Sequence, residues 1–318
     1  MLDILEEINE KGYHDMTKDE LVFNFNNEQP KLNTNYKEDE TFKNVQVMLM
    51  CVNNSAFKLN SKTYNLSLLG KTMKDWVLNS VKDFSVREIE CNFNDDFLPL
   101  VKQNINVEKK YTLVLFSDTP LIKNSTIKEI IEYFTIKDLS VLKFTRGFMF
   151  KTEYLITIDK LYNPQMHYFD EEDFITCFNL KQYSLVMDIL KARIIAFHQN
   201  NGVVIEDATS TIIDADVSID SGVIVKASSK ILGKSLVESG AVISYNSLID
   251  SSVIMANSLI ENSIIKNSIV GKNSVVKNYS IVENNAFIGE NCTLSGFNSI
   301  KSKSLIDGIT LKEFEKRE

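Results

Sequence analysis

Asp118 is the residue whose type and position first suggest a chemical role. It follows an apolar run, YTLVLF (111–116), that has the composition of a strand buried on both faces of a sheet. Ligand sites of parallel α/β sheets lie beyond the carboxyl ends of the strands, which is where a carboxylate at this position would stand. A turn that begins at Asp118 and leads into Pro120 is the plainer interpretation of the same residues.

The other common catalytic motifs are missing from the sequence. It contains no phosphate-binding Walker loop, no dinucleotide glycine motif, no nucleophile elbow and no paired spacing of cysteines or histidines for zinc. The three histidines are His14, His167 and His198. A histidine near the end of a helix, such as His198, more often packs or caps than acts as a base.

Composition narrows the classes of partner. The net charge of −8 argues against a nucleic-acid backbone as ligand. No run approaches the roughly 18 apolar residues of a membrane span, and the acidic start MLDILEEINEK lacks the basic segment of a signal peptide. Four cysteines without paired spacing indicate reduced thiols. We therefore expect a cytoplasmic protein that binds neither nucleic acid nor membrane.

Alternating strands and helices are predicted around Asp118. The strands fall at 45–52, 86–91, 111–116 and 139–144, with a fifth at 153–158, and the helices at 72–81, 98–103 and 125–137, the last capped by Ser125. This alternation predicts a doubly wound, mostly parallel α/β sheet over residues 45–178. Residues 1–44 are predicted to be an N-terminal extension, with a short helix over residues 1–12 and little regular structure over residues 13–44. Residues 13–44 are interpreted either as a mobile arm or as a strap that packs on the next domain through Phe23 and Phe25.

Residues 179–202 carry apolar side chains at helical spacing. Asn179 can cap the first turn of this helix, and Gly202 can end it. Because the sequence pattern changes after Gly202, we interpret the segment as a linking helix between two domains.

From Ile213 to Ile306 an aliphatic residue recurs at every sixth position, and a small residue, usually Ser, stands two positions before most of them. Five-residue steps interrupt the repeat at Ile249–Ile254, Ile260–Ile265 and Ile265–Val270. A period of six is typical of a parallel β-helix, in which each hexad is one short strand and one corner. We predict about five coils over residues 203–306, with tightened corners at the short steps. Residues 307–318 are predicted to form a charged helix or tail.

Three stretches give the chain a resemblance to a known family. LVLFSDTPLI (113–122) resembles a strand that ends in Gly-Asp-x-Pro-Leu, SKTYNLSLLGKTM (61–73) resembles a segment with Pro-Lys and later Gly-Lys-x-Met, and FNLKQYSLV (178–186) with GVVIEDATSTIIDADVSI (202–219) resembles the join into a β-helix. The family is that of the sugar-1-phosphate nucleotidyltransferases, and the bacterial UDP-N-acetylglucosamine pyrophosphorylases are the most similar members. The resemblance covers about residues 45 to 306. It implies a Rossmann-like nucleotidyltransferase domain followed by a left-handed parallel β-helix.

The resemblance also implies a pair of residues that bind a metal ion. The family's aspartate maps onto Asp118 and the asparagine before its linking helix maps onto Asn179. Two such oxygen ligands suit Mg²⁺, which bridges phosphates. A lysine that contacts phosphate or sugar maps onto Lys62, with Lys58 as a second candidate. The structural alternatives are a turn residue at Asp118, a helix cap at Asn179 and a solvated lysine at Lys62.

Two loops of the family are changed in this chain. Where the family has Gly-x-Gly-Thr-Arg-Met, the sequence reads VNNSAFK (52–58), without a glycine, and Phe57 stands where the arginine would neutralise pyrophosphate. The family's Leu-Gly-Thr-Gly loop is replaced by CNFNDD (91–96), whose Asp95 and Asp96 would repel a triphosphate that they faced. Any nucleotide binding is therefore expected to be weak and to depend on the metal.

The β-helix lacks the histidine base and the long inserted loop that the acetyltransferases with this repeat use. Those enzymes deprotonate the acceptor amine with a histidine, and here all three histidines precede residue 203. The repeat also contains no long inserted loop that could wrap a substrate. We therefore expect no acetyl transfer from coenzyme A.

Two functions of different class follow. The first is an Mg²⁺-dependent sugar-1-phosphate nucleotidyltransferase, which joins a nucleoside triphosphate to a sugar-1-phosphate and releases pyrophosphate. The second is a catalytically inactive relative that acts as an oligomeric scaffold or as a regulatory, ligand-binding protein. Asp118 and Asn179 favour the first, and the lost glycine loops favour the second. In either case the resemblance implies a homotrimer that assembles through the β-helix.

Overall fold

The structure is a computed structural model, and it describes residues 40–317 of the 318-residue chain. The predicted N-terminal extension lies outside the described residues except for its end, which contains helix α2 (Glu40–Lys43). The chain divides into two compact units within helix α7 (Leu180–Asn200), the first unit ending at Ile189 and the second beginning at Leu190. Among the helices between residues 40 and 317, none combines the length and the apolar character that crossing a bilayer requires.

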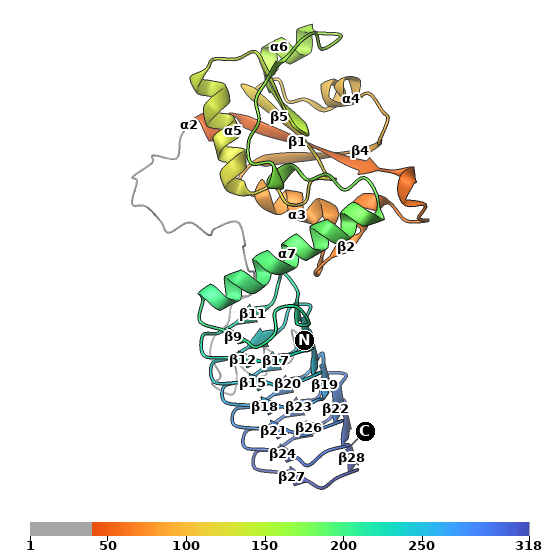
Figure 1. The fold of residues 1–318 in the computed structure, drawn as a ribbon, viewed down its shortest axis with the longest axis vertical. Helices are drawn as coiled ribbons and strands as arrows, with labels where there is room; N and C mark the ends of the chain where they lie inside the picture. Colours follow the sequence, from red (N-terminus) through yellow and green to blue (C-terminus); the bar gives the residue numbers. More distant parts are fainter. Residues whose placement is uncertain (1–39, 318) are drawn as a thin grey trace. The chain divides into compact units, whose positions relative to one another are not determined.

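The first unit is built on a six-stranded sheet with the strand order β4-β1-β5-β7-β6-β8 (Figure 1). Its strands are β1 (Val45–Asn53), β4 (Ser85–Asn92), β5 (Tyr111–Phe116), β6 (Val141–Phe144), β7 (Gly147–Lys151) and β8 (Gln165–Met166). β1 pairs in parallel with both β4 and β5, and β6 pairs in parallel with β8. Only β7 runs antiparallel to its neighbours within this sheet. The predicted α/β fold class is confirmed.

Helices cover both faces of this sheet. They are α3 (Met73–Ser80), α4 (Phe97–Asn104), α5 (Asn124–Ile136) and α6 (Thr152–Thr157), and the shorter pieces are β2 (Ser67–Leu68), β3 (Lys71–Thr72), η2 (Ser55–Phe57), η3 (Thr63–Asn65) and η4 (Glu172–Phe174). Side chains of β1 point alternately to the two faces, as the pleat of a strand requires. Val47 and Leu49 join a core with α3 and α5, whereas Met48 and Met50 join a core with α4 and α6. This two-sided burial explains why β1 and β5 are apolar throughout.

The strand predicted at 153–158 is wrong, because this segment forms helix α6. The next strand after β6 is instead β7, which follows it in a hairpin and buries Met149 and Phe150. In α6 Leu155 is buried and its neighbour Ile156 is exposed, so only one side of the segment faces the core.

The predicted cap of helix α5 is also wrong. The helix begins at Asn124, so Ser125 lies inside its first turn. The backbone N–H of Lys123, at the helix start, donates to the Asp173 carboxylate at 3.3 Å. A tertiary acceptor 50 residues further along the chain therefore takes the place of a local cap.

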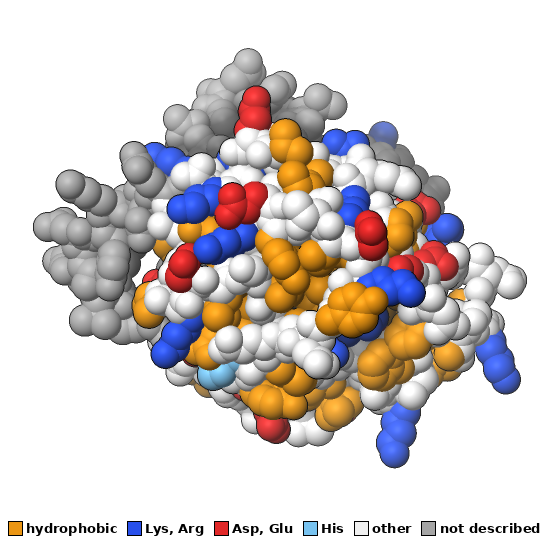
Figure 2. Space-filling model, turned by 90° about the horizontal axis from the view of Figure 1, so that it is seen from above, with side chains coloured by type: hydrophobic (Ala, Val, Ile, Leu, Met, Phe, Trp, Pro, Cys, Tyr) orange, Lys and Arg blue, Asp and Glu red, His pale blue; other side chains and the backbone are white. Residues whose placement is uncertain are grey.

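The surface seen in Figure 2 mixes side chains of different kinds. Hydrophobic groups are interspersed there with basic and acidic ones, and neither sign of charge gathers into a continuous patch. A nucleic-acid backbone is bound by a surface with clustered Lys and Arg. The described residues on this face of the molecule do not form such a surface.

The second unit is a left-handed parallel β-helix with three sheets (Figure 1). Its strands are β9 (Val204–Ile205), β10 (Ile212–Ile213), β11 (Ser218–Ile219), β12 (Ile224–Val225), β13 (Lys230–Leu232), β14 (Leu236–Val237), β15 (Val242–Ile243), β16 (Leu248–Asp250), β17 (Val253–Ile254), β18 (Leu259–Ile260), β19 (Ile264–Lys266), β20 (Ile269–Val270), β21 (Val275–Val276), β22 (Ile281–Glu283), β23 (Phe287–Ile288), β24 (Thr293–Leu294), β25 (Ser299–Lys301), β26 (Ser304–Leu305), β27 (Thr310–Leu311) and β28 (Lys316–Arg317). Three consecutive strands make one coil, and each strand pairs in parallel with the strand one coil later. The coils from β10 to β27 number six, one more than the sequence predicted.

The predicted lumen residues from Ile213 to Ile300 are all buried. The prediction that Ile306 faces the lumen is wrong. Ile306 is 75% exposed, and the lumen position belongs to Leu305, which is 4% exposed. The step from Ile300 to Leu305 is therefore a fourth five-residue step. The segment predicted as a charged helix or tail instead continues the β-helix through β27 and β28, with Leu311 buried.

The short steps are tightened corners, as predicted. Ser251, Asn262 and Asn267 each adopt a positive φ, of 49°, 40° and 45°, in the corners that follow strands β16, β18 and β19. The strands on either side keep their pairing, so no loop is extruded. Asparagine tolerates this left-handed conformation better than most residues, which explains why it recurs at the corners.

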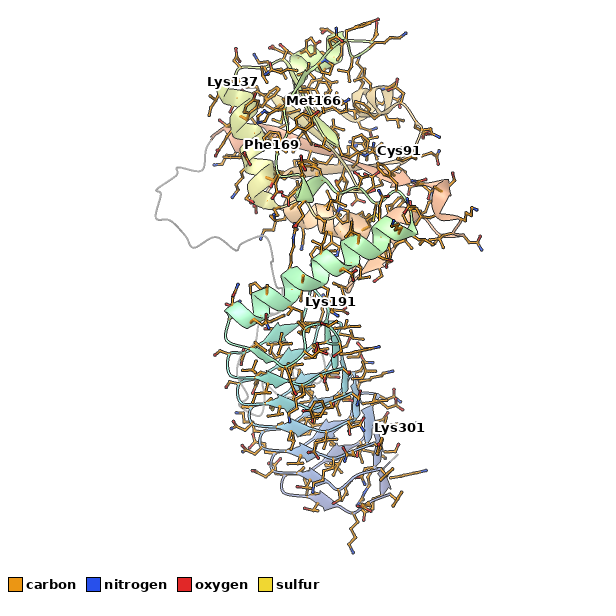
Figure 3. The ribbon with its side chains drawn as sticks, in the orientation of Figure 1. Cys91, Lys137, Met166, Phe169, Lys191 and Lys301 are labelled. Atoms are coloured by element: carbon orange, nitrogen blue, oxygen red, sulfur yellow. The ribbon has the colours of Figure 1, made fainter. Side chains whose placement is uncertain are left out.

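The serines that precede the lumen positions also form hydrogen bonds between successive coils. The Ser235 hydroxyl oxygen accepts the backbone N–H of Ser252, and the Ser252 hydroxyl oxygen accepts that of Ser268, at 3.2 and 3.1 Å. These bonds join successive coils at a buried corner where no strand pairing is present. On the outside, Lys301 forms an ion pair with Glu283 of the preceding coil at 3.0 Å (Figure 3).

Candidate functional site

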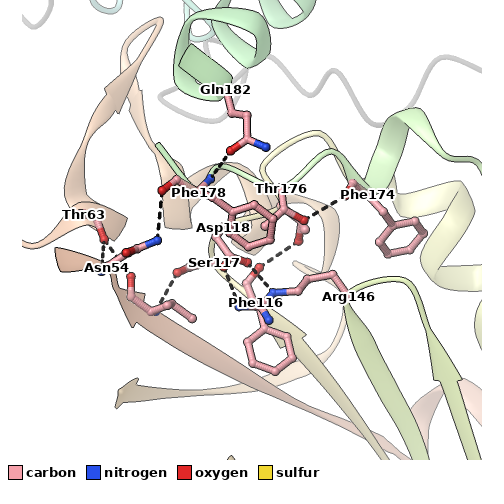
Figure 4. A network of polar contacts seen from close by, with 12 residues as sticks. Asn54, Thr63, Phe116, Ser117, Asp118, Arg146, Phe174, Thr176, Phe178 and Gln182 are labelled. Carbon is pink, nitrogen blue, oxygen red and sulfur yellow. Dashed lines mark hydrogen bonds and ion pairs between the residues drawn. The ribbon is translucent and has the colours of Figure 1, made fainter. Parts of the chain in front are cut away.

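Asp118 lies just beyond the carboxyl end of β5, where the sequence placed it (Figure 4). Ser117 prolongs the pairing with β1, because its N–H donates to the Met50 carbonyl and its hydroxyl accepts the Val52 N–H, both at 2.9 Å. The Asp118 carbonyl accepts the N–H of Cys177 at 2.8 Å. The side chain of Asp118 is buried, with 4% of the residue exposed. The backbone at Asp118 is thus fixed on two sides.

Arg146 pairs with this carboxylate. It stands in the two-residue turn between β6 and β7, where Phe144 pairs with Gly147. Its Nε donates to Oδ1 of Asp118 at 3.1 Å and its Nη2 donates to Oδ2 at 2.7 Å (Figure 4). This is the bidentate geometry in which a guanidinium binds a carboxylate most strongly.

Gly147 allows the turn to approach the sheet. A Cβ at this position would lie 2.1 Å from a ring carbon of Phe144 and 2.8 Å from the carbonyl oxygen of Val114. Both distances are shorter than Cβ contacts in real proteins, so only glycine fits. The glycine therefore sets how closely Arg146 can stand to Asp118.

Aromatic rings surround the guanidinium. The Cζ atom of Arg146 lies 4.1 Å from the ring centroid of Phe116, 5.4 Å from that of Phe93 and 6.0 Å from that of Phe178. Phe93 and Phe178 themselves meet edge to face, with centroids 5.4 Å apart. Ring faces attract a cation, and these rings also keep water from much of the ion pair.

Burial shapes the ionisation of the groups nearby. It raises the pKa of Asp118, while the hydrogen bonds and charge of Arg146 act in the opposite direction. Burial, aided by the Asp118 charge, raises the pKa of the Cys177 thiol to about 12. Burial likewise raises the pKa of the Cys91 thiol, in β4, to about 11 (Figure 3). Neither thiol is a nucleophile at neutral pH, because the thiolate is the reactive form.

Asn179 is the N-cap of helix α7. Its Oδ1 accepts the backbone N–H groups of Lys181 and Gln182 at 3.0 and 3.1 Å, as the sequence predicted for a cap. The chain just before it is tied to the sheet edge through the bond from Cys177 to the Asp118 carbonyl. The two predicted metal ligands thus belong to one edge of the unit, but each side chain already has other partners.

The donor set of Asp118 and Asn179 does not fit Mg²⁺ as it stands here. Both carboxylate oxygens accept from Arg146, and the amide oxygen accepts from two N–H groups of its own helix. Between residues 40 and 317 no cluster of three His, Cys, Asp or Glu side chains is arranged to hold a metal ion.

The two predicted lysines are exposed. Lys62 forms an ion pair with Glu90 at 3.2 Å, and both side chains are more than half exposed. Exposed pairs of this kind contribute little to stability. Lys58 is exposed and ends helix η2 in the left-handed conformation, with φ of 53°. The structure therefore favours the alternative of a solvated lysine for Lys62, and Lys58 is likewise at the surface.

The glycine-free first loop is closed by its own bonds. Asn54 caps helix η2 by accepting the Ala56 N–H at 3.0 Å, and its Nδ2 donates to the Phe178 carbonyl at 3.1 Å. The Asn54 N–H donates to the Thr63 hydroxyl at 2.9 Å. Phe57 is 3% exposed and belongs to the core. Backbone donors that would face a phosphate in an open glycine loop have partners within the protein.

The acidic pair in the second changed loop has structural roles. Asp96 caps helix α4 by accepting the Leu98 N–H at 3.1 Å. Asp95 accepts the Asn92 N–H at 2.7 Å. Asp95 thus closes a turn and Asp96 caps a helix.

Arg146 and its aromatic neighbours were missed by the sequence analysis. Arg146 lies 28 residues after Asp118, in a strand pair that was not predicted. The signal that could have found it is the sequence KFTRGFMF (143–150), in which apolar residues flank a short turn that ends in glycine.

The fold defines a class: proteins in which an α/β domain precedes a parallel β-helix. Residues 213–314 match the family described as the GMPPB C-terminal domain. The chain is 31% identical over 160 residues to the bifunctional protein GlmU of Rippkaea orientalis, a match that covers 49% of this chain and 35% of that one. The chain is therefore similar in part to a GlmU protein, and it spans about a third of the length of the curated relative that it matches.

Solved structures show more distant likenesses. Rv0371c of Mycobacterium tuberculosis H37Rv has a TM-score of 0.37 and 10% identity, and the match covers 46% of this chain and 98% of that one. A mutant of perosamine N-acetyltransferase from Caulobacter crescentus has a TM-score of 0.33 and 11% identity, covering 83% of this chain and 92% of that one.

Proposed function

We propose that the α/β unit binds a nucleotide or a sugar phosphate at the Asp118 edge without transferring a nucleotidyl group. The protein would then be a catalytically inactive relative of the sugar-1-phosphate nucleotidyltransferases. The single observation that carries the proposal is the first loop, in which Asn54 engages the Ala56 N–H and Phe57 is buried in the core.

This loop lacks what transfer requires. A nucleotidyl transfer places negative charge on the leaving pyrophosphate, which backbone N–H groups and a fixed cation stabilise. Each charge-assisted hydrogen bond of that kind is worth about 1.5–3 kcal/mol. Two losses therefore correspond to roughly a hundredfold or more in binding of the transition state.

The ligand class is supported by the groups that remain at the edge. The Arg146 side chain is 22% exposed, and its guanidinium carries more N–H donors than the two that Asp118 accepts. Guanidinium donors suit phosphate oxygens, and aromatic rings such as Phe93, which is partly exposed, can stack on a planar base or a sugar.

A pyrophosphate-release assay tests the proposal. The purified chain is incubated with Mg²⁺, each of the four nucleoside triphosphates and a series of sugar-1-phosphates. We expect no release above that of an Asp118→Ala variant, and we expect calorimetry to detect binding of at least one of these ligands. Release that Asp118→Ala abolishes, and that a surface control such as Lys303→Ala keeps, would refute the proposal.

One observation favours the enzyme as a second candidate. The bond between Cys177 and the Asp118 carbonyl brings the segment of Asn179 to the edge where Asp118 stands. If substrate binding drew Arg146 away, Asp118 and Asn179 would be candidates to hold Mg²⁺, which neutralises charge on phosphates. This candidate predicts turnover that requires added Mg²⁺.

For the β-helix we propose assembly as a homotrimer. The outward positions of one sheet form an aliphatic row in register, made of Val204, Ile224, Val242, Leu259 and Val275. Val204 and Ile224 are well exposed, and exposed aliphatic rows of this kind mark interaction surfaces. Light scattering coupled to size exclusion should give three times the mass of 36.3 kDa, and Leu259→Lys should give monomers. A monomeric wild-type protein would contradict the assignment.

A further inference from the structure

We propose that Arg146 takes the place at Asp118 that a divalent cation would otherwise occupy, so that the site binds its phosphorylated ligand without a metal. The metal-free ligand binding rests on the proposed function. The exchange of metal for guanidinium rests on side-chain geometry alone, and it is tested without any nucleotide.

The first step is that both oxygens of the Asp118 carboxylate already accept hydrogen bonds. Its Oδ1 and Oδ2 each accept one N–H of the same guanidinium, at 3.1 and 2.7 Å. Mg²⁺ requires oxygen ligands at about 2.0–2.1 Å in near-octahedral geometry. An ion that close to the carboxylate would stand beside the positive charge of Arg146, in a site where little water screens the repulsion.

The second step is the anchoring of Arg146. Its turn is short, Gly147 lets that turn approach the sheet, and the guanidinium lies 4.1 Å from the ring centroid of Phe116. The cation is therefore placed by the fold itself. An exposed arginine on a long loop could swing away at little cost, whereas this one would leave a buried carboxylate without its counter-charge.

The third step is the lack of a second metal ligand. Asn179 was the implied partner of Asp118, and its amide oxygen caps helix α7 through two backbone N–H groups. Using this oxygen for a metal would uncap the helix. In the wild-type protein neither oxygen is therefore available. Removing Arg146 would free the Asp118 carboxylate, and a divalent ion can be held by one carboxylate together with several waters.

The Arg146 guanidinium still has N–H groups that can donate hydrogen bonds to a ligand. Nε and Nη2 of Arg146 are engaged by Asp118, and within residues 40–317 the Nη1 group donates no hydrogen bond. Nη1 has two N–H groups and Nη2 has one more that Asp118 does not accept, and the parallel N–H bonds of Nη1 and Nη2 match two oxygens of one phosphate. The ligand class is therefore a phosphate group that the guanidinium binds directly. This replaces the expectation that nucleotide binding depends on metal.

The experiment measures binding of Mn²⁺ alone, by electron paramagnetic resonance, to the full-length protein. The wild type should show no saturable site. Arg146→Gln should gain one site, with affinity at least tenfold above the wild-type background, and adding Asp118→Asn should remove it. Arg146→Lys keeps the charge and should exclude the metal as the wild type does. Lys151→Gln is the matched control, because it breaks an ion pair with an exposed carboxylate, Asp138, and should gain no site.

Three results would overturn the inference. One is saturable Mn²⁺ binding to the wild type that Asp118→Asn abolishes. Another is equal metal binding by Arg146→Lys and Arg146→Gln, because the charge would then be irrelevant. The third is the absence of a gained site in an Arg146→Gln protein whose circular dichroism and melting are those of a folded chain. If that variant fails to fold, the wild-type measurement and Arg146→Lys still decide. Pyrophosphate release is scored separately, so failure of the proposed function is visible apart from these results.

Discussion

The lumen of the β-helix permits a sharp test with two neighbouring residues. Val275 and Val276 form strand β21, and the pleat turns the first outward and the second inward. Val276 pairs in register with Ile260 of the coil before and Leu294 of the coil after, and all three are fully buried. The same substitution at the two positions therefore meets opposite environments.

Val276→Asp should unfold the β-helix, whereas Val275→Asp should leave it folded. The inward change forfeits about 1.5–3 kcal/mol of apolar burial. It also places an unpaired carboxylate in an apolar column, which costs several kcal/mol more even after relaxation. The sum is about 5 kcal/mol or more, comparable to the whole stability of a typical domain, about 5–15 kcal/mol.

Urea unfolding followed by circular dichroism measures both variants, and limited proteolysis reports which unit opens. Val275→Asp should change the free energy of unfolding by less than about 1 kcal/mol. A Val276→Asp protein that unfolds at the same urea concentration as Val275→Asp would refute the assignment of the inward row.

The α/β unit and helix α7 offer three further tests. Arg146→Met leaves the buried Asp118 without its partner and should lower the free energy of unfolding by about 3–5 kcal/mol, measured by thermal melting; a loss below about 1 kcal/mol would show that the pair is not buried as described. Gly147→Ala sets a methyl group against the Phe144 ring and should cost about 1–3 kcal/mol in the same assay, where an unchanged melting temperature would contradict the geometry. Burial lowers the pKa of His198 from 6.5 to about 4. Between these two values the unfolded chain binds a proton at His198 and the folded chain does not. Stability should therefore fall by up to about 3 kcal/mol as the pH drops from about 6.5 to about 4. His198→Leu should flatten this dependence in urea titrations, and an unaltered slope would exclude His198 as its source.

The β-helix could be predicted almost entirely because its geometry is local. Each coil repeats the same requirement for an inward aliphatic residue, so the period is visible in the chain without knowledge of distant contacts. The error at Ile306 has the same cause. The step to Leu305 is short, and too few repeats follow it to reveal the new register.

The α/β sheet was predicted where its strands are buried on both faces, as for β1 and β5. It was missed at β7 and α6, where the apolar runs are short. A run of that length fits a strand or a helix equally well, and the hairpin partner decides between them. The start of helix α5 was misplaced because Asp173, distant in sequence, supplies the acceptor there.

The candidate site shows the same division. The position of Asp118 at a strand end and the cap formed by Asn179 are local features, and both were present in the sequence. The state of the Asp118 carboxylate was not, because it depends on Arg146, on the glycine that lets its turn approach, and on the rings of Phe93, Phe116 and Phe178. These groups come from four separate segments of the chain. Only the tertiary structure brings them within hydrogen-bonding and ring-contact distance, and that contact decides whether the carboxylate is available to a metal or already neutralised by the protein.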